Sequence, residues 1–511
     1  MPRRFTAALI GLALLAIAAR LIPGPRIIDD AYITYRYAAN LAAGHGLVYN
    51  PGEPVLGTTT PLYALLLVPA ALLGGPAALP VVSPILNTLV DAANVVLLAL
   101  LARRLLGENL PGLLAGMLWA VAPRSVTFAI GGMETALAVA LMLAAFTLWL
   151  GGRSRPAAAL TALATLTRPD ALIWAGPLAL GMIVERWRST QGKPLARLPW
   201  AELGVYLAVV LPWVIYGTLT YGSPLPHSIA AKSAAYDLPP THALTALVQQ
   251  FSTPFVEFEA FGPGGAMAGS VIYAGLFAVG SLHLIRRDGR AAALVAYPAL
   301  FWLAFGLANP LMFRWYTTPP LAVFMLALIG GVTAFTQALR SAPARHAVLG
   351  AAGALWLGMS LNAWTLHPDH GPDRPAPSMA WIALELQYER AARLLAPYVE
   401  PDTVIAAGDI GAVGWYSGAR ILDTLGLVSP QSTAYYPLPA SMIAGMAYAV
   451  APDLILEERP DYLIILEIYG RRGLLLDPRF EQSYRLIERI ESDVYDSDGM
   501  LIYARRDMPA P

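Results

Sequence analysis

The sequence predicts a polytopic α-helical membrane protein that carries a C-terminal α/β domain outside the membrane. Of the 511 residues, 57% are hydrophobic and 13% are charged, whereas about a quarter of the residues in soluble domains are charged. Apolar segments long enough for helices recur over residues 1–365, and arginines gather beside alternate segments. A polar, proline-rich stretch follows, and short strand-like runs come after it. These observations together define a membrane domain, a linker and a soluble domain.

The apolar segments begin with residues 5–22. Pro23-Gly24-Pro25 offers no small-residue cleavage site after this segment, which is long enough to cross a bilayer, so we expect an uncleaved first span. Further segments bring the expected total to about eleven spans. They are residues 82–102, 110–123, 134–150, 157–166, 171–184, 203–219, 267–285, 291–307, 316–339 and 347–361.

Arginine placement tests this topology, because basic residues concentrate on the inner side of a membrane. Basic groups precede the first span and then follow alternate spans: Arg3/Arg4, Arg103/Arg104, Arg153/Arg155, Arg186/Arg188/Lys193/Arg197, Arg286/Arg287/Arg290 and Arg340/Arg345. This count places the N-terminus inside and the C-terminal region outside. Residues 61–73 are apolar but short, and counting them as a span would invert the topology. We therefore expect them to form a juxtamembrane or re-entrant helix in a first outer loop of residues 23–81.

The polar linker covers residues 366–378, and the soluble domain covers residues 379–511. Met379–Leu395 has apolar residues at helical spacing, which predicts an amphipathic helix. Strands are expected at residues 403–407, 420–422, 462–466, 484–490 and 500–504, which are bounded by Gly, Pro and Asp. The result is an α/β domain of roughly 130 residues, a usual domain size.

Two adjacent acids, Asp29 and Asp30, lie just beyond the first span. Carboxylates beside lipid must stay hydrated or find partners, so a pair there indicates chemistry. A simpler interpretation is that Asp30 caps the helix that follows, AYITYRYAANLA. The two roles are compatible, and the sequence leaves both open.

Polar and aromatic groups continue along this loop. We expect Tyr35, Asn40, His45 and Glu53 to bind a sugar, since rings stack on sugar C–H surfaces while amides and carboxylates bind hydroxyls. An interfacial aromatic belt is the alternative, but it explains only the tyrosines. Glu134, in GGMET, is either a helix cap or a further acceptor-side ligand.

The run DDAYITYRYAANLAAGHGLVYNPGEPVLGTTTPLY resembles the first outer loop of the GT-C superfamily of membrane glycosyltransferases. It is most similar to the branch that adds terminal arabinofuranose from decaprenyl-phospho-arabinose. The stretches GGMETAL, LTRPDAL, YGSPLPHSIAAK, RWYTTPP and GDIGAVGWYSGARILDTLGL are similar to later parts of that family. Gly57-Thr58-Thr59-Thr60 departs from it, because relatives usually carry Gly-aromatic-Thr-Asn there. The resemblance implies a GT-C fold in a bacterial cytoplasmic (inner) membrane and a polyprenyl-phospho-sugar donor.

Sugar transfer from such a donor needs a base at the acceptor hydroxyl and cations at the leaving phosphate. Asp29 and Asp30 are the expected catalytic carboxylates, with a slight preference for Asp29 as the base. Arg168, Lys232 and Arg314 sit at expected outer span ends, with Arg36 as a further phosphate-binding candidate. Each cation taken alone could instead be snorkelling at the interface.

Other chemistry has little support in the sequence. The histidines lack zinc-site spacing, so no metal site is expected, although a divalent cation at Asp29 and Asp30 stays open. There is no P-loop and no cysteine, and the 34 acidic and 34 basic residues balance, so nucleotide hydrolysis, disulfides and nucleic-acid binding are not expected. In the soluble domain, the most sugar-like cluster is Asp409, Trp415, Tyr416, Arg420 and Asp423, where Asp423 could instead cap a turn.

The sequence therefore predicts an inverting glycosyltransferase that moves a sugar from a polyprenyl-phosphate donor to a cell-envelope glycan, lipid or protein acceptor on the outer face. The soluble domain would bind or position the acceptor. The alternative is a polytopic transporter or lipid-linked sugar flippase. Transporters place ionisable residues near the bilayer midplane, whereas most charges here fall at span ends, which favours catalysis.

Overall fold

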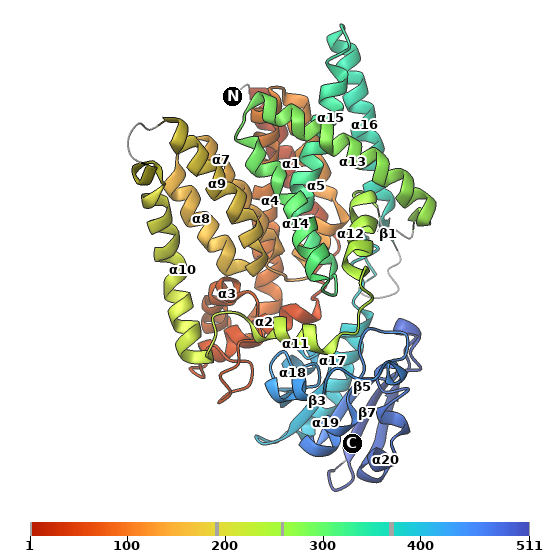
Figure 1. The fold of residues 1–511 in the computed structure, drawn as a ribbon. Coiled ribbons are helices and arrows are strands. Elements are labelled where there is room, and N and C mark those ends of the chain that lie inside the picture. Colours follow the sequence, from red (N-terminus) through yellow and green to blue (C-terminus); the bar gives the residue numbers. More distant parts are fainter. Residues whose placement is uncertain (1–2, 190–193, 257–259, 367–372, 510–511) are drawn as a thin grey trace.

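A computed structural model describes residues 3–189, 194–256, 260–366 and 373–509 (Figure 1). A helical bundle forms one part of the molecule, and a domain with a β-sheet forms the other. The N-terminus lies at the end of the bundle far from this domain. The two parts agree with the membrane and soluble domains expected from the sequence, and the chain is a membrane protein.

All eleven predicted spans coincide with helices of the bundle. The bundle helices are α1 (Arg3–Leu21), α4 (Leu79–Leu106), α5 (Asn109–Val121), α6 (Pro123–Ile130), α7 (Thr135–Leu150), α8 (Ser154–Thr167), α9 (Leu172–Ser189), α10 (Trp200–Tyr221), α13 (Gly262–Arg287), α14 (Ala291–Ala308), α15 (Thr318–Thr336) and α16 (Ala342–Asn362). Within the described residues, six helices are long and apolar enough to cross a membrane, or seven if α5 and α6, bent by 48°, form one span. The expected count of about eleven is not confirmed.

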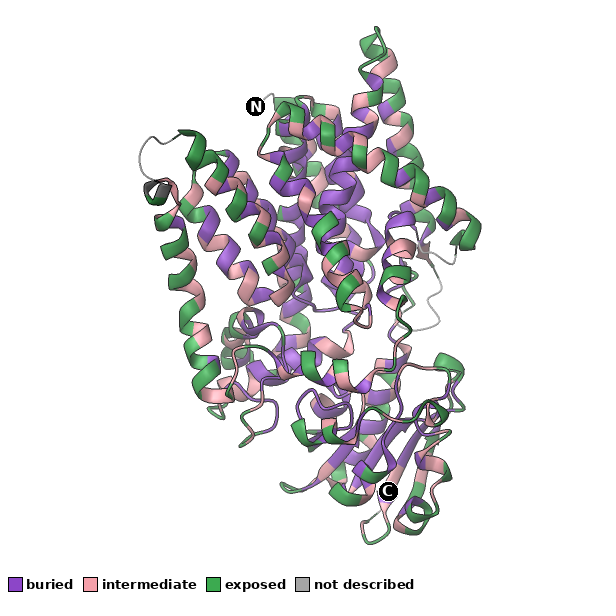
Figure 2. Cartoon of the chain, viewed as in Figure 1, coloured by how far each residue is buried: buried purple, intermediate pink, exposed green. Residues whose placement is uncertain are grey.

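Burial separates central helices from peripheral ones in the bundle (Figure 2). Helix α15 buries most of its side chains, whereas α10 buries only Glu202 and Gly217. Large apolar side chains such as Leu219, which is 82% exposed, therefore face outward on α10. An apolar helix exposed in this way is suited to contact with lipid acyl chains.

A buried ion pair joins α1 to α4 inside the bundle. Arg20 contacts the Asp91 carboxylate, which also accepts hydrogen bonds from Trp119 Nε1 at 3.0 Å and Ser125 Oγ at 2.6 Å. Arg20 Nη1 donates to the carbonyl of Ala120 at 2.8 Å, beside the bend between α5 and α6. Because a buried charge is costly unless it is paired, this fully paired network indicates a structural role.

Four further short α-helices precede the soluble domain in the chain (Figure 1). They are α2 (Asp29–Ala42), α3 (Pro61–Gly74), α11 (His227–Ala235) and α12 (His242–Ser252). Helix α3 covers the apolar segment that was expected to be helical without spanning. Its depth in a membrane stays a prediction.

The C-terminal domain holds a five-stranded sheet in the order β4-β3-β5-β7-β6. Its strands are β3 (Val404–Ala407), β4 (Arg420–Asp423), β5 (Tyr462–Leu466), β6 (Tyr484–Ile490) and β7 (Met500–Arg505), all at or within two residues of the predicted positions. Strand β3 is parallel to β4 and β5, and the other pairs are antiparallel. The helices are α17 (Ala383–Leu395), α18 (Gly411–Ser417), α19 (Pro452–Glu458) and α20 (Pro478–Ser483).

Part of the predicted linker forms a short strand. Within residues 366–378, Ala376–Pro377 forms β2, which pairs with β1 (Trp364–Thr365) directly after α16. Residues 367–372 lie outside the described part of the chain. Arg26, in the first outer loop, donates to the carbonyl of Ala380 at 3.1 Å and so ties the start of the soluble domain to the bundle.

Helix α18 docks on α2 through charges at both of its ends. The Asp29 carboxylate accepts hydrogen bonds from the backbone N–H groups of Gly411 at 2.8 Å and Ala412 at 2.7 Å, in the first turn of α18. At the other end, Arg36 donates to the carbonyls of Gly414 and Ala419. Because a helix is positive at its N-terminus and negative at its C-terminus, both contacts also suit the helix dipole.

Two glycines let α18 approach this closely. A Cβ at Gly411 would overlap the backbone carbonyl of Asp29, and one at Gly414 would overlap Tyr49 Oη and lie 2.7 Å from Arg36 Nη1. One buried apolar cluster runs through the contact, from Tyr35 and Tyr63 to Val413 and Leu463. The first outer loop and the soluble domain therefore share a core.

Replacing Gly414 with Ala should weaken this docking. Alanine gains about 1 kcal/mol of helix propensity, but overpacking a close contact costs about 1–3 kcal/mol, so we expect a lower Tm and faster hydrogen exchange over residues 411–417. The matched control is Gly358→Ala in α16, where a Cβ meets nothing within 4 Å. Equal Tm values for the two variants would contradict a tight α2–α18 contact.

Candidate active site

A cavity of about 810 Å³ lies between the helical bundle and the soluble domain. Its lining comes from α2, the first outer loop, the start of α7, the α8–α9 connection, α11, the end of α14 and the segment before α15. Leu427 of the soluble domain also contributes. Ligand pockets usually fall between about 300 and 1,000 Å³, so this cavity has the size of a small-molecule site.

The two adjacent acids face different surroundings. Asp30 lines the cavity, whereas the Asp29 carboxylate is bound to the backbone of α18. Successive residues on a helix point about 100° apart, which explains the division. Neither acid caps its own helix, because α2 has no side-chain cap. The capping interpretation for Asp30 is therefore wrong, and Asp29 caps a helix of the other domain instead.

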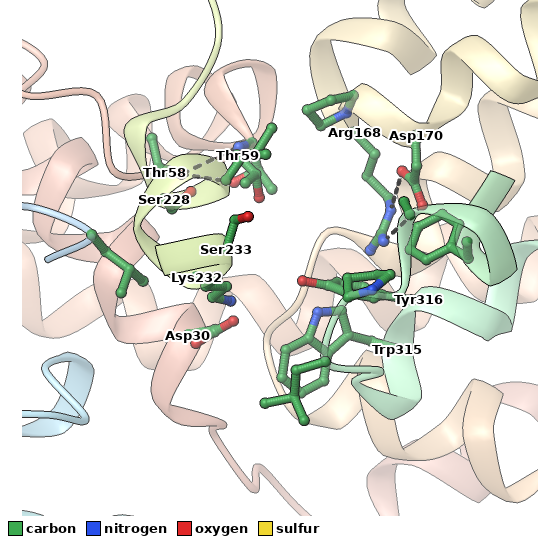
Figure 3. Close-up of a pocket in the computed structure, with 18 of the residues that line it drawn as sticks. Asp30, Thr58, Thr59, Arg168, Asp170, Ser228, Lys232, Ser233, Trp315 and Tyr316 are labelled. Carbon is green, nitrogen blue, oxygen red and sulfur yellow. Dashed lines mark hydrogen bonds and ion pairs between the residues drawn. The ribbon is translucent and has the colours of Figure 1, made fainter. Parts of the chain in front are cut away.

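Lys232 lies on the same side of the cavity as Asp30 (Figure 3). Its ammonium sits 4.4 Å from the centre of the Phe313 ring, and no carboxylate forms an ion pair with it among the described residues. Burial lowers the pKa of Lys232, but the neighbouring Tyr316 hydroxyl and the Asp30 carboxylate outweigh burial and raise it. Lys232 therefore presents a positive charge to the cavity.

Helix α11, which carries Lys232, is held at both ends by other parts of the chain. His227 N donates to the carbonyl of Leu56 at 2.7 Å in the first outer loop, and Asp237 N donates to that of Ala447 at 3.1 Å in the soluble domain. Asn309 Oδ1 accepts from Ala243 N at 2.9 Å, at the start of α12. The first outer loop and the soluble domain thus hold the two ends of the helix that carries the lysine, and Asn309 holds the start of the next helix.

Hydroxyl groups line this wall, and the sequence reasoning missed the two serines among them. Thr58, Thr59, Ser228 and Ser233 line the cavity beside Lys232 (Figure 3). The Ser228 side chain is buried, at 3% exposure, and its Oγ has no hydrogen-bond partner among the described residues. Ser228 and Lys232 are four residues apart on α11, so they share a face. That spacing within HSIAAK is the signal that could have identified the serine.

Arg168 stands on the opposite side of the cavity (Figure 3). It donates from Nε and Nη2 to the two carboxylate oxygens of Asp170, both at 3.0 Å, and from Nη1 to Glu134 Oε1 at 2.8 Å. Arg168 and Glu134 are 5% and 4% exposed. This triad, Glu134–Arg168–Asp170, in which Glu134 and Arg168 are buried, leaves no excess positive charge on the Arg168 side.

Two aromatic side chains accompany the triad. Trp315 and Tyr316 line the cavity, and the Arg168 guanidinium lies 5.6 Å from the centre of the Tyr316 ring. Arg314, next to them in the chain, is not among the residues that line the cavity. Arg36 also lies outside it, buried against Tyr49 and α18.

Most of the residues expected to bind sugar lie outside the cavity. Tyr35 is buried with its hydroxyl on Ser83, and Asn40 donates to the carbonyls of Val48 and Tyr49. Glu53 pairs with Arg420 of the soluble domain. His45 is exposed at a loop tip outside the cavity. Of the five residues in this group, only Glu134 lines the cavity.

The cluster proposed in the soluble domain also has structural contacts. Trp415 and Tyr416 pack on Tyr32 of α2, and Tyr416 Oη lies 2.8 Å from Tyr32 Oη. Asp423 is fully buried and accepts from the backbone N–H groups of Leu425 and Val428, so it caps the turn that carries Leu427. Its pKa is raised to about 6, chiefly by burial.

Carboxylates crowd the interface between α2, α17 and the end of β3. Burial raises the pKa of Asp29 well above its usual range, and the charges of Asp409 and Asp30 add to this. Burial also raises the pKa of Asp409 to about 6 and that of Glu385 to about 7. Among the residues that the structure describes, no group of three or more His, Asp or Glu side chains could hold a metal ion. The divalent cation left open from the sequence is therefore not supported.

Two solved structures with the same fold contain a bound polyprenyl-type phosphate. ArnT from Cupriavidus metallidurans bound to undecaprenyl phosphate is similar over 100% of both chains, with a TM-score of 0.60 and 12% identity. The oligosaccharyltransferase AglB from Archaeoglobus fulgidus, in complex with an inhibitory peptide and a dolichol-phosphate, matches 99% of this chain and 75% of its own, with a TM-score of 0.54 and 13% identity. At these identities the likeness establishes a shared fold.

Sequence comparison adds a relative and a domain family. The terminal beta-(1->2)-arabinofuranosyltransferase of Mycobacterium tuberculosis is 34% identical over 230 residues, 41% of this chain. The chain spans about a third of the length of that relative, 35%. Residues 380–505 match a family described as a domain of unknown function, DUF8728.

These findings define a membrane protein with the GT-C fold, as the first outer loop predicted. The sequence similarity to the arabinofuranosyltransferase covers only part of each chain. The structural similarity to ArnT covers the whole chain, so it includes the soluble domain as well as the helical bundle.

The buried carboxyl groups should make the protein less stable as pH rises. Unfolded Asp and Glu titrate near pH 4, whereas Asp409 and Glu385 titrate near 6 and 7 in the folded protein. The folded state therefore binds more protons between about pH 4 and 7, so stability falls through this window. We expect Tm in detergent to decrease from pH 5 to pH 8, with a smaller slope for Glu385→Gln. The exposed Glu491→Gln should keep the wild-type slope, and a Tm that rises with pH would contradict the prediction.

Proposed function

We propose that this protein is an inverting glycosyltransferase that transfers a sugar from a polyprenyl-phosphate donor. The observation that carries the proposal is one cavity, between the bundle and the soluble domain, into which a carboxylate, Asp30, and a lysine without an ion-pair partner among the described residues, Lys232, both project. A base and a phosphate-binding cation are the two groups that the reaction requires. The GT-C fold and the arabinofuranosyltransferase relative support the same reaction class.

Asp30 is the proposed general base. The acceptor hydroxyl gives its proton to the Asp30 carboxylate while its oxygen attacks the anomeric carbon of the donor sugar. The bond from that carbon to the phosphate oxygen breaks, the electron pair leaves with polyprenyl phosphate, and the configuration at the carbon inverts. This assignment replaces the preference for Asp29, because the Asp29 oxygens are occupied by the backbone of α18.

Lys232 and Ser228 are the proposed phosphate ligands. The leaving phosphate gains negative charge as the bond breaks, and an ammonium in a water-poor site stabilises that charge. The Ser228 hydroxyl is buried without a partner among the described residues, and a phosphate oxygen would accept its hydrogen bond. Arg168, in contrast, is already bound to two carboxylates.

The first isoprene units of the donor would lie against the apolar part of the lining. Ile173, Ala304, Phe305 and Ala308 form this part, at the ends of α9 and α14. A polyprenyl chain leaving the cavity there would enter the acyl region of the membrane, where burial of apolar groups is favourable. The undecaprenyl phosphate and dolichol-phosphate bound by ArnT and AglB are ligands of this chemical class.

The acceptor would reach Asp30 from the side of the soluble domain. In a bacterial cytoplasmic membrane, the arginine distribution places this domain outside and the N-terminus inside, so the acceptor is a cell-envelope glycan, lipid or protein. The transporter alternative receives less support, because the buried Arg20–Asp91 pair inside the bundle is fully engaged in hydrogen bonds.

The two aspartates should respond differently to substitution. Asp30→Asn removes the base and should lower kcat by about 10²- to 10⁴-fold with little change in Tm. Asp29→Ala leaves two backbone N–H groups of α18 without an acceptor, at a cost of about 1–3 kcal/mol each, so it should lower Tm. Transfer from polyprenyl-phospho-pentose to an acceptor glycan measures the first effect, and thermal unfolding measures the second. Wild-type kcat for Asp30→Asn would remove Asp30 from the mechanism.

Substitutions on α11 should act on the donor. Lys232→Gln is expected to lower kcat by about 10²- to 10³-fold, the usual effect of losing a preorganised charge-stabilising donor, and Ser228→Ala should raise KM for the donor. The KM for the acceptor should stay within about twofold, because neither group contacts it in the proposed arrangement. Ala230→Ser, at an exposed position of α11 outside the cavity lining, serves as the control. Equal increases in both KM values would contradict a phosphate role.

A further inference from the structure

The Arg168 side of the cavity differs in charge from the Lys232 side. Lys232 has no ion-pair partner among the described residues, whereas Arg168 contacts both Asp170 and Glu134. With both carboxyl groups ionised, the triad sums to one negative charge, and with one protonated it sums to zero. A phosphate placed there would meet no excess positive charge and at least one carboxylate, so Coulomb repulsion opposes phosphate binding.

The triad still presents hydrogen-bonding groups of both kinds. Arg168 has five N–H groups, and three are used by Asp170 and Glu134, which leaves one N–H on each terminal nitrogen. Each carboxylate oxygen has a second lone pair, so the triad can accept as well as donate. Neighbouring hydroxyls on a sugar ring each need one donor and one acceptor. The triad therefore matches a pair of vicinal hydroxyls.

The aromatic residues on the same side complete the match. Trp315 and Tyr316 both line the cavity, where Tyr316 contacts Arg168 and Trp315 packs on Tyr316 with ring centroids 5.8 Å apart. Tyr316 lies between the two sides, since it contacts Arg168 and also interacts with Lys232. The apolar C–H face of a sugar packs on such rings, while its hydroxyls point toward polar groups at the edge.

We propose that the triad Glu134–Arg168–Asp170, with Trp315, is the subsite for the donor's sugar, and that it selects an uncharged sugar with vicinal hydroxyls. The inference rests on the proposed function, since it divides the same cavity into a phosphate side at Lys232 and a sugar side at Arg168. It reassigns Arg168, which the sequence suggested as a phosphate ligand. A sugar that bears a carboxylate would be repelled by Asp170 and Glu134.

Binding of two lipids that differ only in the sugar tests the subsite. One is polyprenyl-phospho-pentose, and the other is the methyl phosphodiester of the same polyprenol, which has the same charge and no sugar. Asp170→Asn and Glu134→Gln should each weaken binding of the sugar lipid by about tenfold, the loss of one hydrogen bond to a charged group. Binding of the methyl lipid should stay within about twofold. Lys232→Gln should weaken both lipids.

Other outcomes overturn the subsite. If Arg168 binds the phosphate, removing either carboxylate charge should tighten binding of both lipids. Equal weakening of both lipids, or no change in either, would also contradict the assignment. Glu134→Gln and Asp170→Asn keep the shape of each side chain, and the methyl lipid reports whether each variant is folded. If wild-type protein binds neither lipid, the proposed function fails and the subsite fails with it.

Discussion

The structure depends on the contact between α2 and α18, in which two charges of one helix hold the two ends of another. Asp29 binds the N-terminal N–H groups of α18, and Arg36 binds its C-terminal carbonyls, seven residues further along α2. Each contact satisfies backbone groups that a helix end leaves without a partner. Gly411 and Gly414 bring the helices close enough for both contacts at once. The soluble domain is thereby fixed against the first outer loop.

This contact also orients the cavity. Asp29 and Asp30 are neighbours in the first turn of α2. Because the hydrogen bonds from α18 to Asp29 hold this turn in place, they also fix the direction in which the Asp30 side chain points, toward the cavity. Asn50 adds a second attachment, since its side chain pairs with the backbone of Ile421 on the edge strand β4. The segment after helix α11 adds a third attachment, the backbone hydrogen bond from Asp237 to Ala447. The proposed base and the proposed phosphate ligand thus both depend on contacts made by the soluble domain.

Much of this fold could be predicted from periodicity and composition. The eleven apolar segments are helices, and Tyr462–Leu466 and Tyr484–Ile490 are strands at the predicted residues, because these signals are local. Partners distant in the chain could not be predicted. Arg36 and Asp29 look like site residues in the sequence, but their partners lie in residues 411–419, and only the fold brings them together. Arg168 looks like a lone cation until Glu134, 34 residues earlier, is placed beside it.

Because Leu427 lines the cavity, the cavity is complete only when the C-terminal domain has folded against the bundle. Leu427 comes from a turn capped by Asp423 in the C-terminal domain, whereas Asp30 lies much earlier in the chain, before the bundle helices α4 to α16. A chain made only as far as the bundle still lacks Leu427 and the α18 backbone that binds Asp29. Completion of the cavity therefore depends on folding of the C-terminal domain.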